Sequence, residues 1–145
     1  ATLAKSCTSP AALLAGLGVQ AVDIFAADDY FVVVDSEEIV RATQPDFAKL
    51  AALDLRGVCV TARGCNVDFV SRFFAPKFGI PEDPVTGSTH CALTPYWAKN
   101  LNKSILSARQ ISKRGGDIQC ELKGNRVTLA GYAVTFMEAE IFLPS

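Results

Sequence analysis

The sequence has little that would place it in a membrane or carry it across one. Its 145 residues contain no hydrophobic run long enough to span a bilayer. The longest candidate, Ala11 to Leu17, is short and is interrupted at Gly16. That run also lacks the basic flank and the cleavage site of a signal peptide. We therefore expect a protein without a membrane partner.

Paired cysteines and metal-ligand spacings are absent as well. Five cysteines are scattered along the chain, and no two of them form a C-x-x-C pair. An odd, dispersed set is typical of reduced thiols in a cytoplasmic protein rather than of a disulfide or zinc framework. The single histidine, His90, has no further ligands at suitable spacing, so we expect no metal site.

Excess charge of either sign is missing too. Lys and Arg number 14 against 15 Asp and Glu, which gives a net charge of -1. Without a basic stripe, nucleic acid and anionic membrane surfaces are excluded as expected partners. Half of the residues are hydrophobic, which is enough for one soluble globular domain over residues 1–145 with a substantial core.

The chain begins without an initiator Met, and Ala1 to Thr8 is typical of a connector. No acidic residue occurs before Val19. We therefore expect a segment of a longer polypeptide, whose upstream part would have to supply any acidic group needed from that side.

Hydrophobic periodicity and turn residues predict a mixture of helices and strands. Helices are expected over 9–18, 36–42 and 46–53, and a longer apolar helix from about Ser88 to Leu101. Strands are expected over 22–26, 30–34, 57–62, 67–74, 105–111, 117–122, 127–129 and 133–143. This order predicts an α+β fold with a curved, mostly antiparallel, barrel-like sheet rolled around a central apolar helix.

The segment from Glu82 to His90 is the strongest candidate for chemistry. Two carboxylates precede a Pro-initiated turn, and Thr86-Gly87-Ser88-Thr89 then suits the start of a helix. Free N–H groups and the helix dipole at such an end can hold a ligand's carboxylate or phosphate. Asp83 would lie beside that anion. The alternative interpretation is an ordinary capped helix after an acidic turn.

Other side chains in and around this segment have less specific interpretations. Ser88 and His90 are two residues apart on a helix and point in different directions, which argues against a hydrolase nucleophile. A lone histidine on an apolar helix is usually a packing residue. We interpret Glu82 as a carboxylate that lies in the electrostatic field of the first helical turn. Arg72, among aromatic residues, is either a surface charge or a group that steers an acidic substrate.

Two stretches of the sequence resemble a known family. Ser71-Arg72-Phe73-Phe74-Ala75-Pro76 and the run from Glu82 to Leu93 are similar to the PhzF-like isomerases of phenazine biosynthesis. The match continues at Arg114-Gly115-Gly116 and at the earlier segments 44–47 and 57–64.

The resemblance implies a fold like that of diaminopimelate epimerase, in which two similar domains each roll a sheet around a helix. This chain would be the C-terminal domain, with its active site in the cleft between the two. The implied activity is proton-shuttling isomerisation of a small carboxylic acid, without metal or cofactor. Asp83 is then the catalytic carboxyl, and the substrate-binding residues are Thr86, Gly87, Ser88 and Thr89, the last at a position where the family more often has Ala.

The family's principal acid/base is a glutamate of the first domain, which this chain lacks. The resemblance therefore leaves two interpretations open: an isomerase half-site completed by an N-terminal domain or a second chain, or a non-catalytic interaction or scaffold protein. In either case we expect the strand 133–143 to pair with the absent domain. An exposed cleft face would otherwise favour association, for example as a homodimer.

Overall fold

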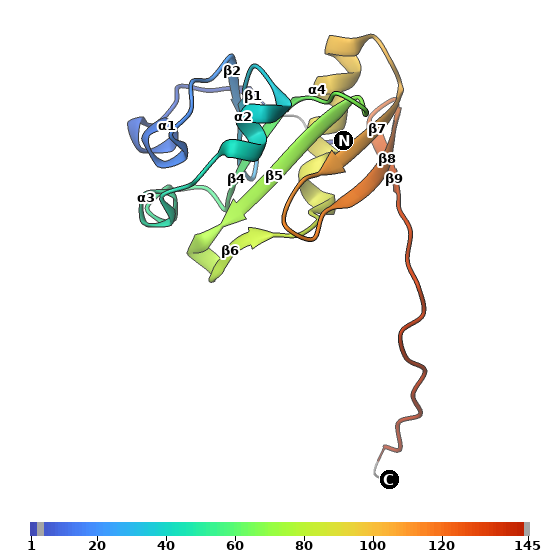
Figure 1. Ribbon diagram of the computed structural model, residues 1–145. Coiled ribbons are helices and arrows are strands. Elements are labelled where there is room, and N and C mark those ends of the chain that lie inside the picture. Colours follow the sequence, from blue (N-terminus) through green and yellow to red (C-terminus); the bar gives the residue numbers. More distant parts are fainter. Residues whose placement is uncertain (3–4, 144–145) are drawn as a thin grey trace.

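A computed structural model describes residues 1–2 and 5–143 of the chain. Part of the expected connector, Ala1 to Thr8, lies outside the described residues. Within them, one mixed sheet has helices on both of its faces (Figure 1). The helices are α1 (Ala11–Leu17), α2 (Glu37–Ala42), α3 (Phe47–Ala51) and α4 (Gly87–Leu101), with a short 3-10 turn η1 (Pro76–Phe78). The strands are β1 (Lys5–Ser6), β2 (Asp23–Ala26), β3 (Tyr30–Val33), β4 (Val58–Arg63), β5 (Phe69–Ala75), β6 (Ile80–Asp83), β7 (Ile105–Gln110), β8 (Gly116–Lys123) and β9 (Arg126–Ala130).

The strand order follows the chain closely. It runs β1-β2-β3-β4-β5-β7-β8-β9, and β6 pairs with β5 beside this path. Most neighbours are antiparallel, as the sequence predicts, but β3 with β4 and β5 with β7 are parallel. The two parallel steps occur where helices α2 and α3, or α4, connect one strand to the next.

The central strands are apolar on both faces because both faces are covered. In β3, Phe31 and Val33 pack in the cluster that contains α4, whereas Tyr30 and Val32 pack with α1, α2 and α3. Side chains alternate across a strand, so a strand covered on both sides must be apolar at successive positions. The same reason explains the apolar run in β4, which is buried from Val58 to Ala62.

Helix α4 is held against the sheet by packing and by one buried hydrogen bond. Trp97 stacks on Phe69 with ring centroids 5.9 Å apart. Its indole Nε1 donates to Thr61 Oγ1 on β4 at 3.0 Å. Pro95 has no N–H and leaves the carbonyl of Cys91 without its helical donor. The backbone N–H of Thr2 donates to that carbonyl at 2.9 Å, so the N-terminal residues compensate for the proline.

The helices predicted over 9–18, 36–42 and 46–53 are present, and particular residues cap their ends. Ser36 Oγ accepts from the backbone N–H of Ile39 and caps α2, and Asp46 caps α3 in the same way at Lys49. Gly18 ends α1 with φ 67°, a left-handed conformation that suits glycine. In α3, Leu50 is buried while Phe47 is 40% exposed.

One prediction about the sheet is wrong. The sheet is not closed into a barrel: within the described residues, β1 and β9 remain its two ends. Residues 133–143 pair with no described strand of this chain, and after Ala130 the chain leaves the body as an extended arm (Figure 1). The pairing of this segment with an absent domain stays a prediction. Local alternation and β propensity favour a strand there, but a strand also needs a neighbouring edge. No described segment lies beside the arm to provide one.

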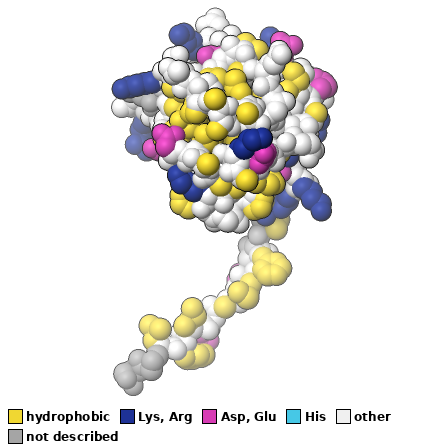
Figure 2. Space-filling model, turned by 90° about the vertical axis from the view of Figure 1, so that its left-hand side faces the viewer, with side chains coloured by type: hydrophobic (Ala, Val, Ile, Leu, Met, Phe, Trp, Pro, Cys, Tyr) yellow, Lys and Arg dark blue, Asp and Glu magenta, His cyan; other side chains and the backbone are white. Residues whose placement is uncertain are grey.

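The arm carries apolar side chains that the rest of the chain does not cover. Figure 2 shows them along its length. Tyr132 is 100% exposed and Phe136 is 97% exposed, and the others are Val134, Met137, Ile141, Phe142 and Leu143. Single exposed apolar residues are ordinary, whereas a contiguous series marks a surface for another partner.

No helix among the described residues is both long and apolar enough to pass through a membrane. The cysteines are all free thiols in this part of the chain.

We predict that Gly57→Ala lowers the free energy of unfolding by about 1–3 kcal/mol through overpacking. An added Cβ would overlap the Phe73 ring and lie 2.9 Å from the carbonyl oxygen of Phe74. Gly87→Ala is the matched control, since its nearest neighbour would be Leu129 Cδ1 at 3.9 Å. Urea unfolding of both variants measures the difference, and equal stabilities would contradict the packing.

Candidate functional site

The site begins where β6 ends and α4 starts. Asp83 is the last residue of β6, paired with Phe73 of β5, and Gly87 is the first residue of α4. Between them, Pro84, Val85 and Thr86 turn the chain from the sheet into the helix. The helix is therefore entered directly from β6, a strand that the sequence pattern did not predict.

The Thr86 hydroxyl binds the Asp83 carboxyl and does not cap the helix. Its Oγ1 donates to Asp83 Oδ2 at 2.5 Å. Thr86 is the N-cap residue of α4, yet its side chain makes no capping hydrogen bond. Among the described residues, the backbone N–H groups of Gly87 and Ser88 have no acceptor. The positive end of α4 is thus left available to an anion.

Gln110, at the end of β7, holds the same turn from inside the protein. Its Oε1 accepts from the backbone N–H of Thr86 at 2.9 Å. Its Nε2 donates to the carbonyl oxygen of Asp83 at 2.7 Å and to Thr86 Oγ1 at 3.1 Å. The side chain is fully buried.

Arg56 reaches the start of α4 from the loop before β4. Its Nη2 donates to Ser88 Oγ at 3.0 Å. Nε and Nη2 also donate to the two carboxylate oxygens of Asp29 at 2.9 and 2.6 Å. This hydrogen bonding to Asp29 raises the pKa of Arg56. Asp29 is buried, so the pair holds the guanidinium in one place beside the helix end.

These groups surround one open hollow of about 320 Å³. Asp83, Thr86, Ser88 and Arg56 form its polar side, and Phe73, Ala75, Phe78 and Ile80 form its apolar side. Such a combination suits a small molecule with one anionic end and one apolar end.

The predicted site residues occupy different positions around this hollow. Asp83, Thr86 and Ser88 line it, and Gly87 is exposed beside it. The Thr89 side chain is buried and does not line the hollow; its Oγ1 has no hydrogen-bond partner among the described residues. Substrate binding by Thr89 therefore stays a prediction. It would involve the backbone of Thr89, because the side chain does not line the hollow.

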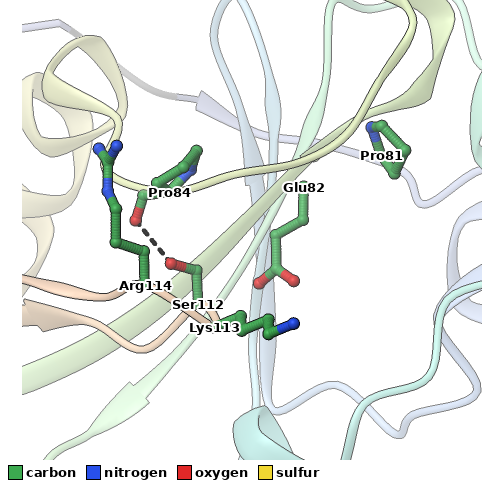
Figure 3. A pocket seen from close by; sticks show the side chains of 6 residues that line it. All are labelled: Pro81, Glu82, Pro84, Ser112, Lys113 and Arg114. Atoms are coloured by element: carbon green, nitrogen blue, oxygen red, sulfur yellow. Dashed lines mark hydrogen bonds between the residues drawn. The ribbon is translucent and has the colours of Figure 1, made fainter.

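A second hollow lies across the Pro81–Pro84 segment from the first. Figure 3 shows Glu82, Lys113 and Arg114 around it, with Ser112 Oγ donating to the Pro84 carbonyl at 2.8 Å. The carboxylate of Glu82 accepts from Arg72 Nε at 2.7 Å, so it is ion-paired there instead of lining the hollow with Asp83.

Arg72 makes hydrogen bonds that connect elements inside the fold. Besides Glu82, its Nη1 donates to the carbonyl oxygens of Val40, Arg41 and Thr43. Only 13% of the side chain is exposed. These contacts tie α2 to β5 and account for the guanidinium without a steering role.

His90 is a buried packing residue, as the sequence predicts. Its ring lies 5.8 Å from that of Phe69, and Nδ1 donates to the carbonyl oxygen of Thr86 at 2.8 Å. Nε2 has no partner in the described part of the chain. Burial lowers the pKa of His90, an effect that the hydrogen bond to Thr86 partly opposes. No group of three metal-binding side chains occurs among residues 1–2 and 5–143.

Comparisons with known proteins identify the family of this chain. The family model described as phenazine biosynthesis-like protein matches residues 7–139. The chain belongs to this family. The predicted resemblance to PhzF-like isomerases is confirmed.

Relatives in the family are about twice as long as this chain. An uncharacterised isomerase of Pseudomonas aeruginosa is 56% identical over 128 residues, which are 88% of this chain and 49% of that protein. A putative phenazine biosynthesis PhzC/PhzF protein from Clostridium difficile superimposes with a TM-score of 0.88 at 40% identity, covering 97% of this chain and 55% of that one. A PhzF family protein of Enterococcus faecalis superimposes with a TM-score of 0.83 at 47% identity, covering 90% of this chain and 52% of that one. The chain therefore spans about half the length of the relatives it matches.

Sequence reasoning did not identify Arg56, Asp29 or Gln110. Asp29 lies in the turn of the β2–β3 hairpin, and no local pattern indicates that it meets Arg56, which is 27 positions later. Gln110 lies in an ordinary strand pattern, 24 residues after Thr86. Only the pairing of β5 with β7 brings it to the site.

We predict that the free energy of unfolding falls as the pH is lowered from 6.5 to 5. Burial lowers the pKa of His90 in the folded protein, so the unfolded chain takes up its proton at a higher pH than the folded protein does. The loss can reach about 1.4 kcal/mol per pH unit, the value for one proton. Urea titrations at several pH values measure it.

His90→Gln is the control, since His90 is the only histidine in the chain. The variant should show a flat stability between pH 5 and 6.5, because the carboxylates with lowered pKa, such as Asp68, titrate below that window. An unchanged slope in His90→Gln would contradict the assignment.

Proposed function

We propose that this chain supplies one half of the active site of a cofactor-independent isomerase that moves a proton on a small carboxylic acid. Asp83 is the catalytic carboxyl of this half. The main glutamate is contributed by an N-terminal domain or a second chain, as the family resemblance implies. The observation that carries the proposal is that Asp83 and the start of α4 border the same open hollow.

The ligand's carboxylate would bind at the start of α4. The N–H groups of Gly87 and Ser88 are unpaired among the described residues and point along the helix dipole. Arg56 adds a fixed positive group next to them. The backbone of Gly87 is open to close approach, since no side chain projects from it.

The apolar side of the hollow would take the rest of the ligand. Phe73, Phe78 and Ile80 line it opposite the helix end. A carboxylate bound at α4 would therefore place the neighbouring carbon atoms between these side chains and Asp83. Carbon acids become more acidic when the adjacent carboxylate is stabilised by fixed positive charge, which is how preorganised dipoles assist proton transfer.

In the proposed step, one carboxylate removes a proton from a carbon of the ligand, and the electron pair is delocalised into the adjacent unsaturated system. A carboxylic acid on the other side returns a proton to a different carbon. Bonds and charges balance without an oxidant or a metal. The two acid/base groups must face each other across the ligand, which requires the second half-site.

The exposed arm supports the proposal that this half of the site has a partner. Its alternating apolar side chains are typical of a strand whose faces are covered elsewhere. We propose that residues 133–143 pair as a strand with the N-terminal domain. In the absence of that domain, the same surface would favour association between copies of this chain.

We predict that Asp83→Asn abolishes proton transfer in the full-length protein. Incubation with a panel of small carboxylic acids in ²H₂O should yield deuterated product with the wild type only, as measured by mass spectrometry. Loss of an acid/base group lowers such rates by about 10²–10⁴-fold. Thermal unfolding should change little, because Asp83 is only half-buried.

Asp23→Asn, at an exposed carboxyl of β2, is the matched control and should retain incorporation. Equal deuterium incorporation by Asp83→Asn and the wild type would remove Asp83 from the mechanism.

The arm is tested separately on the isolated chain. We predict that residues 1–145 associate and bind a hydrophobic dye, and that deletion of residues 132–145 reduces both in light scattering and fluorescence. The deletion should leave the unfolding free energy nearly unchanged, because the arm's side chains are exposed. A clean monomer of the intact chain that binds no dye would contradict the proposal.

A further inference from the structure

The amide of Gln110 directs all of its hydrogen bonds to the four-residue turn from Asp83 to Thr86. Oε1 accepts from the Thr86 N–H, and Nε2 donates to the Asp83 carbonyl and to Thr86 Oγ1. We propose that Gln110 is a positioning residue, which orients the Asp83 carboxyl by determining the direction of the hydrogen bond from Thr86. This inference rests on the proposed function of Asp83.

The direction of each bond in this network follows from which atoms can donate. A backbone N–H can only donate, so the oxygen of the Gln110 amide must face Thr86 and its nitrogen must face Asp83. The amide nitrogen can only donate as well, and Thr86 Oγ1 therefore accepts from it. The hydroxyl proton of Thr86 is left to point at Asp83 Oδ2, 2.5 Å away.

Burial makes this arrangement stable. Gln110 is fully buried, and a buried amide that lost one partner would be left with an unsatisfied polar atom. Rotation of the amide by half a turn would place two donors, or two acceptors, against each other. The Thr86 hydroxyl therefore has one orientation, and one carboxylate oxygen of Asp83 is held while the carboxyl still lines the hollow.

The same end of β7 also holds the middle of the turn. Ser112 Oγ donates to the Pro84 carbonyl at 2.8 Å, as the dashed line in Figure 3 marks. Ser112 Oγ in turn accepts from the Gly115 N–H at 3.0 Å. The backbone of the turn is thereby fixed at Asp83, Pro84 and Thr86. Among the described residues, Gln110 alone donates a hydrogen bond to the hydroxyl that binds the carboxyl.

The test separates positioning from simple support of the fold. Gln110→Glu keeps an acceptor for the Thr86 N–H but has no donor for the hydroxyl, and Gln110→Met keeps the shape without any hydrogen bond. Gln119→Glu and Gln119→Met are matched controls at an exposed glutamine of the neighbouring strand β8. Thr86→Val removes the hydroxyl itself and therefore tests the same hydrogen-bonded path from the Thr86 side.

Two readouts apply to the full-length protein. In the deuterium incorporation assay, both Gln110 variants should lower kcat by about 10²-fold, the order expected for a misplaced group, with KM changed less than about twofold. A Gln110→Met/Thr86→Val double variant should be no slower than Thr86→Val alone, because both changes break the same hydrogen-bonded path to the Asp83 carboxyl. Additive losses, or an unchanged kcat in folded Gln110 variants, would overturn the proposal.

The second readout needs no substrate. The ¹³C resonance of the Asp83 carboxyl at pH 7 should move in Gln110→Met and in Thr86→Val, and should stay in place in the Gln119 variants. An unmoved resonance in Gln110→Met would also overturn the proposal. If the resonance moves while Asp83→Asn retains deuterium incorporation, the proposed function of Asp83 fails and the hydrogen-bonded path from Gln110 to its carboxyl stands.

Discussion

The structure depends on the enclosure of α4 by the sheet. Its apolar side chains pack against β3, β4, β5, β7 and β8, and Trp97 is tied to Thr61 at 3.0 Å. Its first residues, Gly87 and Ser88, nevertheless stay exposed. A helix fixed along its length and open at its positive end is the condition for an anion site.

The surroundings of that helix end are organised by long-range polar contacts. Asp29, buried in the β2–β3 hairpin, holds Arg56 beside Ser88. The Asp29 carboxylate is buried while 40% of the Arg56 side chain is exposed, and such a pair contributes little net stability, because desolvation of the carboxylate opposes the attraction. Its clearer effect here is geometric: it holds one guanidinium at the edge of the hollow. Gln110 has the corresponding effect on the opposite side, beneath Asp83.

Membership of the phenazine biosynthesis-like family relates these features to a larger protein. Relatives in Pseudomonas aeruginosa and the solved Clostridium difficile structure are about twice as long as this chain. The hollow beside Asp83 is open, and the apolar side chains of the arm after β9 are exposed among the described residues. The proposed function assigns both features to a half-site that another domain completes.

The sequence alone determined the local parts of this protein. Hairpin β2–β3, the capped helices α2 and α3, the buried strand β4 and the span of α4 follow from periodicity, caps and turn residues, which act over a few positions. The motif from Glu82 to His90 likewise located the start of α4. Only the tertiary structure decided that Gln110 and Arg56 meet this motif, that the sheet stays open, and that residues 133–143 remain outside it. Those outcomes depend on which strand edges and buried polar groups become neighbours, and contacts between residues far apart in the chain leave no local pattern.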